Sequence, residues 1–424
     1  EDNTIGSYSN IIGVMPDYTG PSWYVSTSGS DAGDGSATAP FSKIQQAIDE
    51  ASENDTIKIN PGTYTGYGNY DINPGKDLVI LGVGGADSVT IDVAGNIADR
   101  KSGFKLESYS YSSMQIKGLT IINALSSTGS GGAIILSNAG SVTIEDCVIG
   151  PGNKAALGAG IYVHNTGVTI KKTVIKGNSV NMTSGIYDGN VHGVGLYINN
   201  TTPSTSTIEN SIIRGNGATA SGNQNDMYGG GFYVTGSATT NFINSFIYNN
   251  DLSRSGNQGW WSRGGGGAVT NGATVYFVHT DILNNKAENT ASASDGRGGA
   301  LWLDGNNTTV FFLNSIIWGN VASTSDAGEQ MFASENSPTI SMNYSDAQVS
   351  QAGTENLNVD PEFNDPENND FSLSLRSDLL GAGATSAMTL YGAHLISDTD
   401  FSGSARPGSG GGNPDIGALE SSLA

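Results

Sequence analysis

Between residues 131 and 320 the chain repeats one pattern of apolar and polar positions six times. Each repeat opens with a glycine cluster and a short apolar run, passes through a polar turn, and closes with a second apolar run followed by Gly or Asn. The openings are GGAIIL (131–136), GAGIYV (158–163), GVGLYI (193–198), GGGFYV (229–234), GGGAVT (265–270) and GGALWL (298–303). The closings are DCVIG (146–150), KTVIKGN (172–178), NSIIRGN (210–216), NSFIYNN (244–250), TDILNN (280–285) and NSIIWGN (314–320). Repetition at a period of about 20–50 residues predicts a solenoid, a propeller or a related array.

The repeats have the composition of β-strands. Their apolar runs are rich in Val, Ile, Phe, Tyr and Thr, are three to five residues long, and are separated by Gly and Asn. No run is long enough for a helix. Short strands that cannot bury their apolar face alone, stacked on copies of themselves, form a parallel β-solenoid. A β-propeller is the alternative, but its blades need four strands per repeat, and these repeats are too short and too often interrupted by glycine.

Alignment of the closings predicts which residues stack above one another, about 4.8 Å apart. The predicted buried column is Val148, Val174, Ile212, Phe246, Ile282 and Ile316. A polar column beside it comprises Cys147, Thr173, Ser211, Ser245, Asp281 and Ser315. A second polar column comprises Asp146, Lys172, Asn210, Asn244, Thr280 and Asn314. The apolar column is expected to form a continuous core, and the polar columns to hydrogen-bond along the stack at the turns.

The chain divides into four predicted segments. These are an N-terminal extension (1–22), an N-terminal cap (23–75), the solenoid (76–346) and a C-terminal capping segment (347–424). The cap contains a predicted amphipathic helix at about 42–51, with Ser42 as N-cap and an apolar stripe that includes Ile44 and Ile48. A helix in this place is typical of the terminal caps that close the exposed core of a solenoid.

The cap motif and the repeats resemble a known superfamily. YVSTSGSDAGDGSATAPFSKIQQAIDEA (24–51), followed by DTIKINPGTYTG (55–66), resembles the N-terminal signature of bacterial secreted right-handed parallel β-helix proteins of the pectin-lyase-like superfamily. The repeats at 118–320 resemble that superfamily's β-helix repeat. DPEFNDPENNDFSLSLRSDLLGAGA (360–384) and PDIGALE (414–420) resemble the closing segment of its cell-surface members. The resemblance implies an all-β, right-handed parallel β-helix with an irregular C-terminal cap, and a secreted, extracellular or cell-surface location.

Composition limits the classes of binding partner that the chain can have. With 18 Lys+Arg against 40 Asp+Glu, the formal net charge is −22, which repels nucleic acid and anionic membranes. We therefore expect no nucleic-acid partner. No apolar run has the length of a membrane span. Cys147 is the one cysteine, so there is no disulfide framework, and in a column of small residues it is expected to be buried and inert.

Length variation between the repeats is confined to the stretch after each closing. The four insertions are 179–193, 217–228, 251–264 and 286–297. Insertions at one fixed position map to one face of a solenoid. They carry the candidate carbohydrate- or partner-binding residues, which are Tyr187, His192, Tyr228, Trp260, Trp261, Arg263 and Arg297. Exposed aromatic rings can stack on sugars, or pack loop against loop and subunit against subunit.

The resemblance leaves catalysis open, because the superfamily holds lyases, hydrolases, adhesins and surface proteins. Its lyases use Lys or Arg as base, often with Ca²⁺ held by carboxylates. Here cations are scarce. Arg263 and Arg297 precede glycine openings in adjacent coils and are expected to stand together beside Asp295. Asp281 and Asp304 have no obvious carboxylate mate for glycoside hydrolysis. The sequence therefore names no catalytic residue.

Two functions follow as hypotheses. The favoured one is a non-catalytic extracellular β-helix protein that builds a filament from copies of itself or acts as an adhesin. The alternative is a secreted polysaccharide lyase or glycoside hydrolase acting on an acidic polysaccharide. An apolar patch in the N-terminal extension, formed by Ile11, Ile12, Val14 and Met15, is the predicted assembly strand that docks on a neighbouring molecule.

Two further site types have weaker signals. The loop SGSDAGDGS (28–36) offers Asp31 and Asp34 as oxygen ligands for Ca²⁺, although Asp-rich turns need no metal. No cofactor is firmly indicated. Asn-x-Ser/Thr sequons predict glycosylation, in a cell that glycosylates, at Asn54, Asn181, Asn199, Asn200, Asn306, Asn307 and Asn343.

Overall fold

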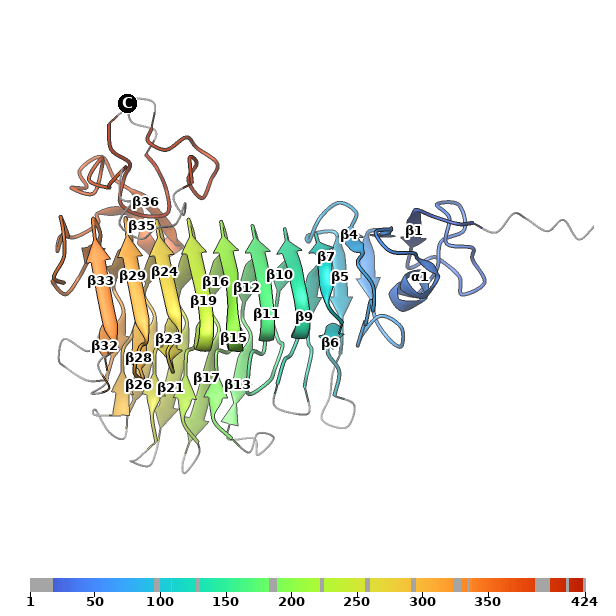
Figure 1. Cartoon of the computed structure of the whole chain (residues 1–424), viewed down its shortest axis with the longest axis horizontal. Coiled ribbons are helices and arrows are strands. Elements are labelled where there is room, and N and C mark those ends of the chain that lie inside the picture. Colours follow the sequence, from blue (N-terminus) through green and yellow to red (C-terminus); the bar gives the residue numbers. More distant parts are fainter. Residues whose placement is uncertain are drawn as a thin grey trace, which may run out of the picture.

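Parallel strands stack into one elongated solenoid in the computed structural model of the chain (Figure 1). The described residues are 18–94, 100–107, 109–126, 130–182, 189–221, 225–255, 260–290, 295–323, 330–333, 336, 338–385, 397–408 and 412–421. Among them α1 (Ile44–Glu50) is the one α-helix, at the N-terminal end of the stack (Figure 1). The predicted all-β parallel solenoid is confirmed.

One wall of the solenoid is a ten-stranded parallel sheet, to which each successive coil adds one strand. Its strands are β3 (Gly62–Tyr64), β5 (Val89–Asp92), β8 (Thr120–Ile122), β10 (Val148–Ile149), β12 (Val174–Lys176), β16 (Ile212–Arg214), β20 (Phe246–Tyr248), β25 (Asp281–Leu283), β30 (Ile316–Trp318) and β34 (Asp346–Ala347). The closings of the sequence repeat form this sheet from β10 onward.

The openings and the polar turns form a second, fifteen-stranded sheet that bends around the remaining walls. Its main path is β1 (Ser22–Val25), β2 (Thr56–Ile59), β4 (Val79–Gly82), β7 (Tyr111–Lys117), β9 (Ile134–Glu145), β11 (Ile161–Lys171), β15 (Leu196–Glu209), β19 (Phe232–Ile243), β23 (Gly267–Thr270), β28 (Leu301–Asp304) and β32 (Met331–Ala333). Off this path lie β6 (Phe104–Glu107), β24 (Thr274–Val278), β29 (Thr309–Leu313) and β33 (Thr339–Asn343). Four strands of this sheet, β9, β11, β15 and β19, each continue past a corner of the coil. These coils therefore do not consist of three short strands.

The core lies one residue further along the chain than the alignment predicts. Asp281, and not Ile282, pairs in register with Phe246 and Ile316. Apart from Ile282, the residues of the predicted apolar column face outward, and Val148 and Val174 are only half-buried. The inner column, whose side chains are at most 1% exposed, is Ile149, Ile175, Ile213, Ile247, Ile282 and Ile317. The predicted buried column is therefore wrong.

The register error arises at one turn. The residue between the two sheets adopts a left-handed backbone, and Asn fills this place in three coils, for example Asn244 (φ 45°) and Asn314 (φ 50°). His279 (φ 47°) fills it in the coil between them. Asn is among the residues that tolerate this conformation best, so Asn in a sequence indicates the turn. His adopts the conformation less often, so the turn at His279 is harder to recognise from the sequence. Thr280 therefore belongs with Ser245 and Ser315, and donates its N–H to the Ser315 hydroxyl at 3.1 Å.

The N-terminal cap is built as expected, with one correction. Ile44 and Ile48 of α1 are buried against the first coil. Ser42 is not the N-cap, because its hydroxyl bonds to Asp31. The Asn69 side chain instead accepts the Ile44 N–H at 2.9 Å. A side chain from the next coil thus satisfies the helix N-terminus and ties the cap to the stack.

The C-terminal segment lies over the outer face of the ten-stranded sheet, along its last coils (Figure 1). It contains a two-stranded antiparallel sheet, β35 (Phe363–Asp365) and β36 (Asp370–Leu373), joined by the 3-10 turn η4 (Pro366–Asn368). Its apolar side chains cover the outward row of the sheet at Phe246 and Ile316. This cover explains why Phe246 is buried although it points away from the solenoid core.

Candidate functional site

The insertions stack as strands. A five-stranded parallel sheet holds β13 (Ser179–Asn181), β17 (Gly217–Ser221), β21 (Asp251–Ser255), β26 (Lys286–Asn289) and β31 (Val321–Ala322). A four-stranded sheet holds β14 (Val191–His192), β18 (Met227–Tyr228), β22 (Ser262–Arg263) and β27 (Gly296–Arg297). Val180, Met227 and Leu252 belong to a separate apolar core between them. The insertions therefore form a second, smaller stack along one edge of the solenoid (Figure 1).

Most of the predicted binding residues meet on the four-stranded sheet. His192, Tyr228, Arg263 and Arg297 are register partners in successive coils. The predicted juxtaposition of Arg263 and Arg297 is confirmed, and their role in binding stays a prediction. Spacing indicated this pair, because each arginine lies just before a glycine opening, but the sequence analysis did not extend the ladder to His192 and Tyr228.

A row of aromatic rings from the fifteen-stranded sheet faces this ladder. Tyr162 stacks on Tyr197 with centroids 5.2 Å apart, and Tyr197 stacks on Tyr233 at 5.5 Å. Trp302 continues the same outward row. The ring of His192 lies 4.6 Å from that of Tyr233. We call this contact the insertion seam, defined by Tyr162, Tyr197, Tyr233 and Trp302 on one side and His192, Tyr228, Trp261 and Arg263 on the other.

The aromatic row was missed by sequence reasoning, although a signal was present. Four of the six openings carry Tyr or Trp at the same place, and the other two carry Ile135 and Ala268. The face to which that place points became clear only with the structure. Burial within the seam lowers the pKa of His192 to about 4, so this imidazole is neutral at pH 7 and acts as a packing group.

Arg263 is the unusual residue of the seam. Its guanidinium carbon lies 3.3 Å from the ring centroid of Trp261 and 4.0 Å from that of Trp302. The side chain is 8% exposed, and no described carboxylate lies within ion-pair distance of it. Burial is the main cause that lowers its pKa. Cation–π contacts therefore take the place of a counter-ion.

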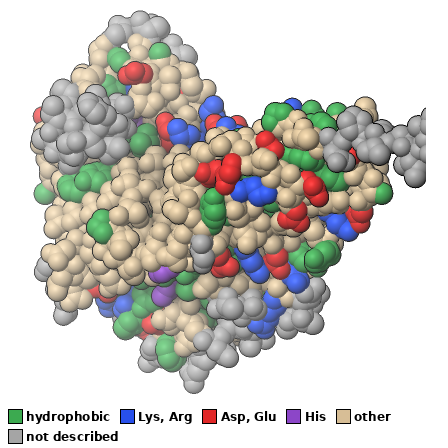
Figure 2. Space-filling view, turned by 45° about the vertical axis from the view of Figure 1, so that its right-hand side comes forward, with side chains coloured by type: hydrophobic (Ala, Val, Ile, Leu, Met, Phe, Trp, Pro, Cys, Tyr) green, Lys and Arg blue, Asp and Glu red, His purple; other side chains and the backbone are tan. Residues whose placement is uncertain are grey.

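Trp261 forms the outer surface of the seam. It is 36% exposed, and one ring face rests on Arg263. Asp226 holds the main chain at this place, because its carboxylate accepts hydrogen bonds from the main-chain N–H of Trp261 at 2.8 Å and from the Tyr228 hydroxyl at 3.2 Å. In Figure 2 the histidine side chains of the visible face lie among hydrophobic and basic side chains. The seam thus presents a positioned indole ring beside two arginines.

The other predicted site residues are placed as follows. Trp260 is half-buried, and its carbonyl accepts a hydrogen bond from the Asn289 amide at 2.9 Å. Tyr187 and the assembly residues Ile11, Ile12, Val14 and Met15 lie outside the described residues. The side chain of Cys147 is buried, and burial raises the pKa of its thiol to about 12, as its place in the column suggested.

The proposed Ca²⁺ loop satisfies its own polar groups. Asp31 forms an ion pair with Lys43, and Asp34 accepts the Ser36 N–H at 2.9 Å. The described residues contain no cluster of three or more His, Cys, Asp or Glu side chains arranged for a metal ion. Ca²⁺ binding at Asp31 and Asp34 stays a prediction.

Four of the sequons, at Asn54, Asn181, Asn306 and Asn307, are exposed. Asn199 and Asn343 are half-buried. Asn200 is fully buried, and its amide oxygen accepts the Thr166 N–H at 3.1 Å, which leaves no access for a modifying enzyme in the folded chain. Glycosylation of the remaining sequons stays a prediction.

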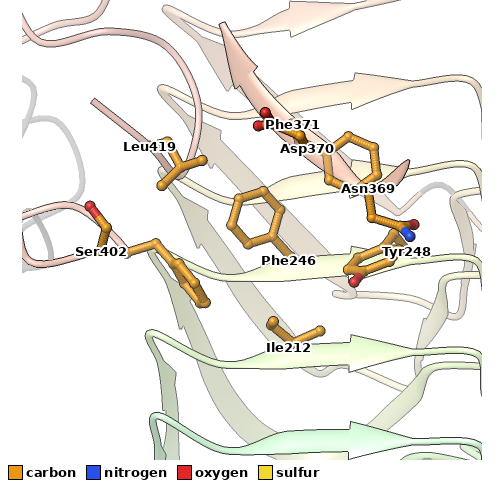
Figure 3. A pocket seen from close by; sticks show the side chains of 9 residues that line it. Ile212, Phe246, Tyr248, Asn369, Asp370, Phe371, Ser402 and Leu419 are labelled. Carbon is orange, nitrogen blue, oxygen red and sulfur yellow. The ribbon is translucent and has the colours of Figure 1, made fainter. Parts of the chain in front are cut away.

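A cleft that the sequence does not predict separates the C-terminal segment from the ten-stranded sheet (Figure 3). Ile212, Phe246 and Tyr248 of the sheet form one side, and Phe401 and Leu419 contribute to the other. The polar column at the turn before the ten-stranded sheet runs along this cleft. Its later members hold main-chain atoms of the C-terminal segment: the Asn244 amide donates to the Thr399 carbonyl at 2.7 Å, and the Asn314 amide bonds both the N–H and the carbonyl of Ala384.

Comparison with known proteins agrees with this architecture. Residues 76–247 match the family model described as "Right handed beta helix region". The chain is a right-handed parallel β-helix. The expected right-handed parallel β-helix fold is thereby confirmed, and membership of the pectin-lyase-like superfamily stays a prediction. No curated protein matches the sequence.

Several solved structures are similar to this β-helix. The pectate lyase Pel9A shares 16% identity at a TM-score of 0.47, over 94% of this chain and 96% of that one. A pectin methylesterase from carrot shares 10% identity at a TM-score of 0.37, over 82% and 86%. A rhamnogalacturonan lyase shares 12% identity at a TM-score of 0.34, over 88% and 98%. At these similarities their activities do not carry over to this β-helix. Its described part holds no helix with the length and hydropathy of a membrane span.

Proposed function

We propose that this β-helix binds a glycan at the insertion seam and does not cleave it. The observation that carries the proposal is the exposed Trp261 ring held against Arg263. An exposed indole face provides apolar surface on which the C–H face of a sugar ring can stack. Because Arg263 packs behind Trp261 and Asp226 holds its main chain, little side-chain entropy is lost on binding.

Charge narrows the class of glycan. A protein with a net charge of −22 repels a densely charged polyanion at long range. Arg263 and Arg297, adjacent in register, favour an anionic group at short range. Both conditions are met by a mainly neutral polysaccharide that carries scattered uronate carboxylates. A location outside the cell, at the surface or secreted, follows from this ligand class and remains part of the proposal.

Glucuronoxylan and its carboxyl-reduced form are a matched pair of probes for this idea. The proposal expects the native polymer to be retained in affinity electrophoresis, and the reduced form to be retained less. Trp261→Ala should weaken retention of both polymers by about tenfold, which corresponds to roughly 1.4 kcal/mol. Arg263→Met should erase the difference between the two polymers.

Tyr67→Ala is the matched control, because Tyr67 is 81% exposed and lies outside the seam. It should leave retention unchanged. Equal retention of the native and Trp261→Ala proteins would remove the seam as the binding site, whatever the affinity.

Polysaccharide lyase activity is the second candidate, and one observation favours it. Burial lowers the pKa of Arg263, and the neighbouring Arg297 adds to the effect, which raises the fraction of neutral guanidine that can act as a base relative to an exposed arginine. The check is a screen on pectate, alginate, chondroitin sulfate and ulvan, with and without Ca²⁺. Absorbance from unsaturated products, lost in Arg263→Ala or Arg297→Ala, would replace binding by cleavage as the function.

A further inference from the structure

Two hollows adjoin under the C-terminal segment and form one cleft. Both are lined by Ile212, Phe401 and Ser402, which places the two hollows side by side. The cleft runs from Val174 of β12 to Tyr248 of β20, which is two strand spacings, or roughly 10 Å. Its two ends differ in chemistry.

The end at β20 has the character of a slot for an aromatic ring. It measures about 260 Å³ and is lined by Phe246, Phe371, Phe401 and Leu419 (Figure 3). Phe401 meets Phe246 edge to face, with centroids 5.0 Å apart. A third ring can add to such an arrangement with favourable edge-to-face or offset contacts. The polar residues of this end, which can meet a ring hydroxyl, are Tyr248, Asn369 and Asp370.

The end at β12 is polar and carries a cation. It measures about 350 Å³ and is lined by Lys172, Thr173 and Asn210. Lys172 is exposed, and no described carboxylate lies within ion-pair distance of it, whereas the neighbouring Lys171 pairs with Glu209 at 3.2 Å. The amide oxygen of Asn210 is buried from water and has no hydrogen-bond partner.

Lys172 and Asn210 belong to the same turn column as Asn244, His279 and Asn314. Those three later members contact the C-terminal segment. The two earlier members line open space, so the polar row continues past the end of its cover. A ligand that sits here would meet a charged or polar group at one end and an apolar slot at the other.

We infer that the cleft binds an aryl carboxylate, with its ring packed against Phe246 and Phe401 and its carboxylate at Lys172. The apolar slot supplies most of the burial, and the lysine selects for the anion. This site is separate from the insertion seam and requires no glycan binding there.

Isothermal titration with 4-hydroxycinnamate and with the neutral 4-hydroxycinnamyl alcohol tests the inference on the full chain. The acid should bind roughly fivefold more tightly than the alcohol, as expected for a partly exposed charge pair. Lys172→Asn should bring the acid down to the affinity of the alcohol and leave the alcohol unchanged. Asn fills the same turn at 210, 244 and 314, so this change does not strain the backbone.

Ile212→Trp should abolish binding of both compounds by filling the floor shared by the two hollows, and circular dichroism checks that the variant is folded. Lys154→Met is the control, because Lys154 is exposed and outside the cleft. It should change nothing. Equal affinity for acid and alcohol in the native protein, binding that survives Ile212→Trp, or no binding of either probe at millimolar concentration would each overturn the inference.

Discussion

Asp281 carries a carboxyl group where the neighbouring coils have Phe246 and Ile316. It is 1% exposed under the C-terminal segment, and one oxygen accepts the Ala418 N–H at 3.2 Å. Burial raises the pKa of Asp281 to about 7, despite the opposing effects of this hydrogen bond and of Arg406. His279 and Arg406 also face this region, and Arg406 pairs with Glu420 at 3.3 Å. A carboxylic acid therefore fastens the C-terminal segment.

Stability should fall as pH rises through the range in which Asp281 ionises. The folded chain keeps the proton up to about pH 7, while the unfolded chain loses it near the ordinary pKa of 3.8. Between these values unfolding releases a proton, so rising pH favours the unfolded state. The loss amounts to at most about 4 kcal/mol. Thermal unfolding from pH 4 to 8 should show the native chain losing stability relative to Asp281→Asn as pH rises to about 7, with a constant difference above that value.

His279 acts in the opposite direction at the acid side. Burial, with Arg406 as a second cause, lowers its pKa well below the ordinary 6.5, so protons taken up by the unfolded chain destabilise the fold as pH falls below that value. His279→Asn, which restores the residue of the adjacent coils, should remove this acid limb. A midpoint difference between the native and Asp281→Asn proteins that stays constant from pH 4 to 7 would show that Asp281 does not titrate in this way.

Val174 and Ile175 give the sharpest test of the register. They are adjacent in sequence, yet Ile175 is fully buried in the inner column and Val174 lines the outer cleft. Ile175→Asp places an unpaired charge in a dry stack and should cost more than about 4 kcal/mol, enough to prevent folding. Val174→Asp should cost about 1 kcal/mol or less. Urea titration followed by circular dichroism compares the two, and similar midpoints would contradict the register.

Among the elements, the asparagine column after the ten-stranded sheet binds the coils most regularly. It comprises Asn153, Asn178, Asn216, Asn250, Asn285 and Asn320, each at most 2% exposed. The Asn250 amide donates to Asn285 at 2.9 Å and to the Ile213 carbonyl at 3.0 Å, and its oxygen accepts the Asn216 N–H at 3.0 Å. Each side chain thus satisfies main-chain groups that the turn leaves unpaired.

Asn250→Ala should lower stability by about 3 kcal/mol or more, because it strands several buried donors and acceptors at once. Thr219→Ala, on the exposed face of the adjacent insertion strand, should change stability by less than about 0.5 kcal/mol. Differential scanning calorimetry measures both. A small effect of Asn250→Ala would mean that ordered water replaces the amide.

The elements that could be predicted from the sequence are those with strong local signals. Apolar runs between Gly and Asn locate the strands of both main sheets, and the stripe of Ile44 and Ile48 locates α1. The insertions carry no such periodicity. Their strands are very short, since β14 and β18 pair over only two residues, and they form by stacking on the coil below. The cleft at Phe401 depends on a segment that returns from more than 150 residues away, so no local pattern announces it.

The whole molecule has a covered end and a partly covered end. At the N-terminal end, the Tyr24 N–H bonds to Gly35, and the Ser26 N–H and the Tyr24 carbonyl bond to Phe41, so a loop closes the free edge of β1. At the other end β33 pairs with β29, and residues after it cover part of its length, since the Asn356 amide donates to the Met342 carbonyl at 2.9 Å. A partly covered edge still invites pairing with another chain. If molecules assemble head to tail, the edge of β33 is a better acceptor for a docking strand than the edge of β1.

Deleting residues 1–17 tests head-to-tail assembly, the hypothesis that rests on the apolar residues Ile11 to Met15. The cut must spare Tyr18, whose ring packs edge to face on Trp23 at 5.2 Å within the cap. The truncated chain should keep the melting temperature of the full chain, because the described cap remains whole.

If Ile11 to Met15 dock on the β33 edge of the next molecule, the contact is heterologous and does not close on itself, so the full chain should form filaments that grow with concentration. Light scattering should then show assembly of the full chain and monomers of the truncated one. Filaments that persist after the deletion would end the exchange-strand hypothesis, and a full chain that stays monomeric at high concentration would leave the β-helix as a single-molecule binder.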